Sequence, residues 1–231
     1  MEKFINNIED LIRESEHTLN EIEKVIFTKR YNMAKKHIEI FAVQSISMIY
    51  AIWEGFIQKS FTLYINELNN LKLSHRDFHE NIQVYYMETK FQQFKNYPLS
   101  NHIKKVKFFV ELNNSYEASF NELKSPINTE SNVNFKVLNK ILDQFCLTPF
   151  KERWGNYSKS SSLKDLLNDF IRFRNSVSHG GDLSSEEKIN QETYNIYKQL
   201  VIDLMYEIQN KFEEAIKNKS YLKNEGGSND Y

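Results

Sequence analysis

The sequence predicts an all-α protein, and three observations lead to that class. The chain of 231 residues has only 6 Gly and 3 Pro, too few for the closely spaced turns of a many-stranded sandwich or barrel. Hydrophobic residues make up 40% and charged residues 26%, which supports a folded core and excludes a wholly disordered or collagen-like chain. Apolar residues recur at three- and four-residue steps, as in amphipathic helices. We expect one helical domain over residues 1–220 and a disordered tail over 221–231.

The first half of the chain predicts two long helices. Residues 2–30 carry apolar positions at helical spacing with acidic residues between them, which is typical of an amphipathic helix. Residues 34–68 are apolar on more than one face, as expected for the central helix of a bundle. The uncharged part of this second segment, Ile40 to Trp53, is 14 residues long, short of the roughly 20 that span a bilayer. A buried core helix and no membrane segment are therefore expected.

Shorter helices are predicted in the middle of the chain. Ser74 and Asp77 are candidate N-caps of a third helix, and Pro98 predicts a break near Tyr97, because the residue before a proline is pushed out of helical geometry. Ser100 is the expected start of the next helix. A polar loop at 125–129 and a short helix over 135–145 follow.

Two helices are predicted at the end of the domain. Ser162 and Asp165 resemble a capping box at the start of a helix that runs to Gly180-Gly181, a strong helix stop. Ser184 or Ser185 is the expected cap of a last long helix that continues to about residue 216.

Charge and cysteine usage narrow the function classes. The formal net charge is -1, so no global basic excess indicates a nucleic-acid-binding protein. The single Cys146 excludes an intramolecular disulfide and a thiolate zinc site, and the acidic N-terminus does not resemble a signal peptide; a cytoplasmic location is expected. His75 and His79 have the spacing of metal ligands on a helix but lack a third ligand. No metal and no cofactor are predicted.

The segment from Arg174 to His179 has the side chains that a metal-free ribonuclease needs. Attack on RNA by its own 2'-hydroxyl requires a proton shuttle, which His supplies near neutral pH, and a fixed cation at the phosphate, which Arg supplies. Asn175 and His179 lie four apart, on one face of a helix. Arg174 and His179 are separated by roughly 140° on an ideal helix, so a helix end, the long Arg stem or a second subunit must bring them together.

Spacing alone is a weak signal, because Arg172 to His179 has a similar separation. The context singles out Arg174: an Asn follows, and Gly-Gly terminates the helix. The alternative is that the helix simply ends here, with His179 interacting favourably with the C-terminal helix dipole.

On these residues the sequence resembles the HEPN superfamily, whose motif is Arg, four to six residues, then His, often Arg-Asn-x-x-x-His. Arg174-Asn175-Ser176-Val177-Ser178-His179 has that form. Tyr50-Ala51-Ile52-Trp53-Glu54-Gly55-Phe56 is similar to the Tyr-Ala-x-Trp-Glu-Gly-Phe helix of a bacterial branch of HEPN nucleases in defence and toxin-antitoxin loci. In that branch, a stretch similar to residues 131–138 precedes the final motif. The commoner form has Ile-Ala where this chain has Val177-Ser178.

The resemblance implies an all-α bundle with long up-down core helices and a long C-terminal helix. It implies a homodimer in which two Arg-x4-His motifs form one metal-independent endoribonuclease site, acting as a toxin or an anti-phage (antiviral defence) effector. Arg174 would hold and stabilise the scissile phosphate, His179 would act as acid or base or orient the 2'-hydroxyl, and Asn175 would position one of them. Single-stranded RNA or tRNA loops are the expected substrates. A neutralising antitoxin or a neighbouring defence protein is the expected partner.

Two alternatives remain open at this point. One alternative to the nuclease is a non-catalytic HEPN module that binds nucleotide, RNA or protein. The other is an α-helical regulatory domain unrelated to HEPN, which requires that both motif matches are coincidences.

Three further positions are supporting candidates. Glu54 lies inside an apolar helix, where a carboxylate needs a partner; Arg174 and His179 are the expected partners, and a purely structural Arg or Lys partner is the alternative. Ser178 makes the edge of the site more polar than in the commoner form. Lys104, Lys105 and Lys107 belong to a run of lysines interleaved with aromatic residues, a pattern of RNA binding or of a solvated helix face over buried rings.

Overall fold

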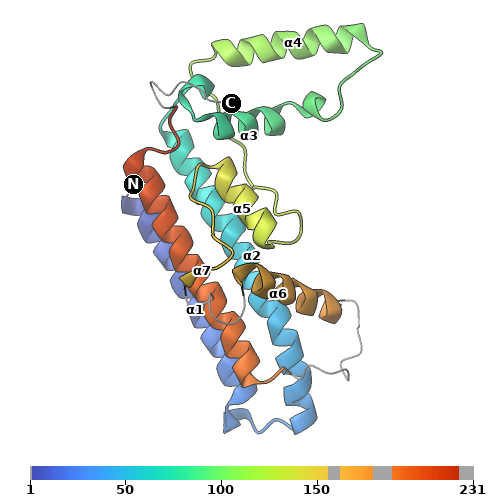
Figure 1. The fold of residues 1–231 in the computed structure, drawn as a ribbon, viewed down its shortest axis with the longest axis vertical. Helices are drawn as coiled ribbons and strands as arrows, with labels where there is room; N and C mark the ends of the chain where they lie inside the picture. The colour runs from blue at the N-terminus through green and yellow to red at the C-terminus, as the bar shows by residue number, and fades with distance from the viewer. Residues whose placement is uncertain (1, 156–161, 179–188, 224–231) are drawn as a thin grey trace.

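The computed structural model describes residues 2–155, 162–178 and 189–223. Three long helices form its main bundle: α1 (Glu2–Phe27), α2 (Lys35–Asn70) and α7 (Gln191–Asn218) lie side by side (Figure 1). The predicted all-α class is confirmed, because the described residues form no strand, only an isolated bridge between Phe78 and Leu222. The shorter helices are α3 (Glu80–Lys90), α4 (His102–Glu117), α5 (Phe135–Gln144) and α6 (Leu163–Ser178), with single 3-10 turns at η1 (Lys29–Tyr31), η2 (His75–Asp77) and η3 (Gln92–Phe94).

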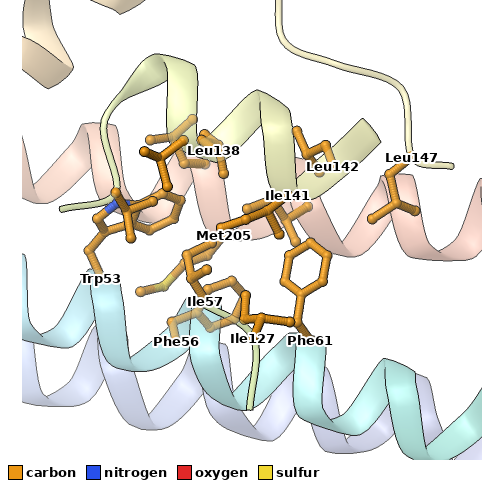
Figure 2. Packing of buried hydrophobic residues seen from close by; sticks show 14 of the residues in the cluster. Trp53, Phe56, Ile57, Phe61, Ile127, Leu138, Ile141, Leu142, Leu147 and Met205 are labelled. Carbon is orange, nitrogen blue, oxygen red and sulfur yellow. The ribbon is translucent and has the colours of Figure 1, made fainter. Parts of the chain in front are cut away.

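Helix α2 is the centre of the fold. It packs against α1, α6 and α7, which explains why its sequence is apolar on several faces. Figure 2 shows Trp53, Ile57 and Phe61 of α2 beneath the α5 residues, with Met205 of α7 among them. Trp53 is fully buried and its ring stacks on Phe56. Trp53 is therefore a core residue and cannot stack on an RNA base without unfolding.

Length and composition alone would allow α2 to cross a membrane, and 44% of its most apolar stretch is buried in the structure. The core helix of a bundle meets the same two criteria. The packing of α2 against three other helices accounts for most of its apolar character, and the exposed remainder is considered below.

Several predicted helix caps are wrong by one to six residues, because other side chains make the caps. Ser74 and Asp77 close the turn η2, with Asp77 Oδ2 accepting from the Ser74 N–H at 3.0 Å, and α3 begins later. The side chain of His79 caps α3 instead. Asn101, and not Ser100, caps α4. The last helix begins at Gln191 after an Asn190 cap rather than at Ser184 or Ser185, which lie outside the described residues.

The tail is predicted from residue 221 onward, but its first three residues pack onto the domain. Tyr221 is 5% exposed and its carbonyl accepts from the His79 N–H at 2.8 Å. The Lys223 N–H donates to the Asp77 carbonyl at 2.9 Å. The early boundary is an error of composition-based reasoning: long-range backbone pairing holds residues whose local sequence looks like a tail. Residues 224–231 lie outside the described part of the chain.

Candidate functional site

Helix α6 carries Arg174 on the face that packs against α2. Leu163, Leu167 and Phe170 are fully buried at spacings of four and three, and Arg174 follows four residues later on the same face. The predicted cap is present, since the Ser162 hydroxyl accepts from the Asp165 N–H at 3.1 Å. The helical period therefore directs Arg174 toward the core.

The guanidinium of Arg174 lies over the ring of Tyr50 on α2. Its Cζ is 4.9 Å from the ring centroid, a cation–π contact of about 0.5–2 kcal/mol depending on its exposure. The same ring contacts Phe170 edge to face at 5.4 Å. Tyr50 is thus a platform that the core holds in place beneath the cation.

Two amide side chains orient the guanidinium further. Nη1 of Arg174 donates to Oδ1 of Asn175 at 2.9 Å and to Oδ1 of Asn132 at 3.4 Å. The first is the positioning contact that the motif implies for Asn175. The second was not predicted, and it comes from a loop 42 residues earlier in the chain.

The same loop, residues 128–134, also binds two polar side chains of α2, those of Tyr50 and Glu54. The Val133 N–H donates to the Tyr50 hydroxyl at 2.7 Å, and the Thr129 hydroxyl donates to Glu54 Oε1 at 2.8 Å. The described hydrogen bond of Glu54 therefore comes from Thr129; of its expected partners Arg174 and His179, the second lies outside the described residues. Glu54 lies one turn beyond Tyr50, and this places its carboxylate against the loop.

The loop has little freedom to move. Glu130 and Ser131 have positive φ angles of 52° and 61°, and the Asn128 side chain accepts from the Glu130 N–H at 2.9 Å. Asn134 caps α5 through the Val137 N–H at 2.8 Å. Consecutive left-handed residues between two side-chain-to-backbone bonds define one loop conformation.

Tyr50 stays neutral in this setting. Burial raises the pKa of Tyr50 to about 12; the Val133 N–H lowers it, the Glu54 carboxylate raises it, and Arg174 lowers it. The hydroxyl therefore keeps its proton over the whole physiological range. It accepts the Val133 N–H as a neutral group and places no negative charge beside the Arg174 guanidinium.

A comparison with models of protein families shows which family the chain belongs to. The model of the MAE_28990-like HEPN family matches residues 2–221. The chain is a HEPN protein. The comparisons with curated proteins and with solved structures gave no significant match.

Three stretches of this HEPN chain converge on one place. Tyr50 and Glu54 come from the first motif, Thr129 to Val133 from the loop, and Arg174 with Asn175 from the last motif. Sequence reasoning singled out the stretch from Ser131 as a family feature but assigned no role to Asn132 or Thr129. The available signal was a short run of Asn and Thr side chains immediately before a capped helix.

The remaining predicted site residues lie either outside the described part of the chain or away from Arg174. His179 lies outside the described residues, as does the side chain of Ser178, the last residue of α6. Lys104, Lys105 and Lys107 are on α4, which lies at the top of Figure 1 beyond α3, whereas α6 meets α2 near its lower half. Within one chain, these lysines are not brought to Arg174.

Proposed function

We propose that this HEPN protein is a metal-independent endoribonuclease that acts as a toxin or anti-phage effector. The observation that carries the proposal is the anchoring of Arg174: an aromatic ring below it, an amide oxygen from its own helix and another from the 128–134 loop. An arginine that is oriented by long-range contacts suits a task that depends on direction, such as binding one phosphate oxygen pair.

In the proposed reaction the RNA supplies its own nucleophile. The 2'-hydroxyl attacks the adjacent phosphorus, and the 5'-oxygen of the next nucleotide leaves. His179 takes or gives the proton, and Arg174 stabilises the charge on the phosphorane oxygens. Asn175 keeps the guanidinium fork in place. Single-stranded RNA or tRNA loops fit this chemistry best, because unstacked nucleotides allow in-line attack.

The proposed site is shared by two copies of the chain. Helix α2 has an exposed row at spacings of three and four, which we call the α2 stripe: Phe41, Gln44, Met48 and Ala51. Phe41 and Met48 are 50% and 47% exposed. Ala51 follows Tyr50 in the chain and lies about 100° from it around the helix. Two α2 stripes in contact would therefore bring the Arg174 sites of both copies to the same interface. The stripe carries no charge, and two copies can meet without repulsion.

A partner that restrains the enzyme belongs to the same proposal. An antitoxin or neighbouring defence protein would keep the nuclease inactive until it is needed, as the resemblance to toxin-antitoxin nucleases implies.

Two arginines of one helix provide the decisive experiment. The purified protein is incubated with total RNA in the presence of EDTA, as wild type, Arg174→Ala, His179→Ala and Arg172→Ala. Arg172 is the matched control, since it lies two residues away, is exposed and pairs with Asp169 at 3.4 Å. Cleavage by the wild type and Arg172→Ala only is expected. Equal cleavage by Arg174→Ala would reject the site.

Expression in a bacterial host tests the biological role. Induction of the wild type should stop growth and produce new RNA fragments, whereas the Arg174→Ala, His179→Ala variant should do neither. Absence of cleavage in every arm, with a folded dimeric protein, would favour the non-catalytic binding module.

A further inference from the structure

Helix α4 is attached to the rest of the protein at two places: Ser115 and Tyr116 near its end contact Tyr86 and His75, and an aromatic cluster holds its middle. Phe108 is 3% exposed, and its ring lies 5.9 Å from Phe91, 5.4 Å from Phe94 and 6.2 Å from Tyr97. Figure 1 shows α4 as the outermost helix, with α3 between it and the long bundle. One face of α4 is therefore used for packing on the α3 side.

The opposite face of α4 is also apolar, and it is open. Leu99, Ile103, Val106 and Val110 are 79%, 81%, 48% and 52% exposed; we call this row the α4 seam. The spacings of three and four put Ile103, Val106 and Val110 in one row along the helix, and Leu99 lies in the turn just before α4. Phe108 lies two residues from both Val106 and Val110, about 200° away around the helix, so the seam cannot reach the aromatic cluster.

The side chains of the α4 seam are not those expected on a helix face that is exposed to water. Isoleucine and valine lose side-chain freedom in a helix and lower its intrinsic stability. Three of them in one row, exposed to water, have no local benefit. A row at this spacing is the pattern by which one helix packs along another.

Lysines border the α4 seam on one side. Lys104 and Lys107 each follow a seam residue by one position and form this flank, whereas the Lys105 ammonium lies over the Tyr97 ring of the aromatic cluster, 5.6 Å from its centroid. Between residues 90 and 110 there are five Lys and no Asp or Glu. The one acid near the seam is Glu111, whose carboxylate is 3.8 Å from the Lys107 ammonium in an exposed, weak pair. Flanking charges of one sign choose a partner of the other sign.

We propose that the α4 seam binds an amphipathic helix of another protein, whose apolar row covers Ile103, Val106 and Val110 and whose flanks carry Asp or Glu. A second copy of this chain does not fit, because two α4 seams in contact would bring lysines against lysines. RNA fits less well than a helix, because the side chains between the lysines are aliphatic and Phe94 and Tyr97 are turned onto Phe108. This inference does not depend on the nuclease activity.

Two designed peptides test the proposal on the full-length protein. Both are helical with leucine at the seam-facing positions; one has glutamate on its flanks and the other lysine. Fluorescence anisotropy should show binding of the glutamate peptide and binding of the lysine peptide that is weaker by about tenfold or more. The double variant Lys104→Glu, Lys107→Glu should reverse this order. Equal binding of the two peptides, or binding of neither, would overturn the proposal.

Aspartate substitutions on two helices locate the surface. Ile103→Asp with Val106→Asp should abolish binding of the glutamate peptide, whereas Val84→Asp should not change it, since Val84 is 57% exposed on α3. Circular dichroism should show the same helix content for all three proteins, because every changed side chain is exposed.

Three other probes decide between occupants. If an RNA oligonucleotide binds, and its binding falls with Lys104→Glu, Lys107→Glu but not with Ile103→Asp, the ligand of this surface is RNA and not a helix. Co-sedimentation with phosphatidylglycerol vesicles that needs the seam would replace it by a membrane surface. A dimer that dissociates on Ile103→Asp would replace it by a second copy. Each of these outcomes overturns the proposal.

Discussion

Replacing Tyr50 by phenylalanine tests whether the 128–134 loop holds Arg174, the arginine of the proposed catalytic site. The change keeps the ring beneath Arg174 and removes only the hydroxyl, which accepts the Val133 N–H at 2.7 Å. Val133 is fully buried, so its N–H has no access to water once the partner is gone. A buried donor left unsatisfied costs about 1–3 kcal/mol, which for a chain of this size lowers Tm by roughly 2 to 12 °C.

RNA cleavage should fall as well, by about tenfold or more, because a loosened loop no longer fixes Asn132 against the guanidinium and small displacements of catalytic groups are costly. Tyr85→Phe is the matched control. Tyr85 is also buried, but its hydroxyl donates to the Lys124 carbonyl at 2.6 Å, in a different loop. It should lose some stability and keep its activity.

Thermal unfolding by circular dichroism and cleavage of total RNA are measured on the same preparations. An unchanged Tm in Tyr50→Phe would mean that the Val133 hydrogen bond does not hold the loop. An equal loss of cleavage in Tyr85→Phe would mean that activity follows global stability and not the position of Arg174.

Three other outcomes are expected. Because burial raises the pKa of Tyr50 from 10.0 to about 12, as it also does for Tyr85, the contribution of Tyr50 to stability is complete below pH 10 and is lost as pH rises toward 12; the wild type should therefore lose more stability than Tyr50→Phe over this window in urea unfolding, and parallel profiles of the two proteins would contradict it. Thr129→Val removes the hydroxyl that donates to Glu54 and should cost about 1–3 kcal/mol in urea unfolding, whereas Thr18→Val, whose hydroxyl bonds its own exposed helix, should change little; equal losses would remove the special role of the loop. Met48→Asp should convert a dimer into a monomer in sedimentation experiments and abolish cleavage, and a dimer that survives would place the interface elsewhere.

Helix boundaries show how far local sequence rules reach. Periodic apolar rows predicted the long α-helices, because burial of one face recurs with the turn of the helix, whereas candidate caps and loop signals predicted α3 and α5. Several candidate caps lie close together at each end, and the sequence does not say which side chain meets an orphan N–H. Ser74 was chosen for α3, but the pairing of His79 with Tyr221 moved the helix start onward.

The site shows the same division. The row Leu163, Leu167, Phe170 already places Arg174 on the inner face of α6, and the motif itself pairs Arg174 with the adjacent Asn175. These are local relations, set by helical period and by neighbours in the chain. Sequence reasoning did not suggest Thr129 as a partner of Glu54, because its hydroxyl comes from a loop 75 residues away.

The sequence by itself determined the all-α class, the central position of α2 and the resemblance to HEPN, since each follows from residue type and spacing along one element. Only the tertiary structure decided that Thr129, Asn132 and Val133 reach Glu54, Arg174 and Tyr50, across separations of 75, 42 and 83 residues. Contacts of that range depend on how α2, α6 and the loop before α5 pack in space, and packing arises from the sum of many buried side chains rather than from any one segment.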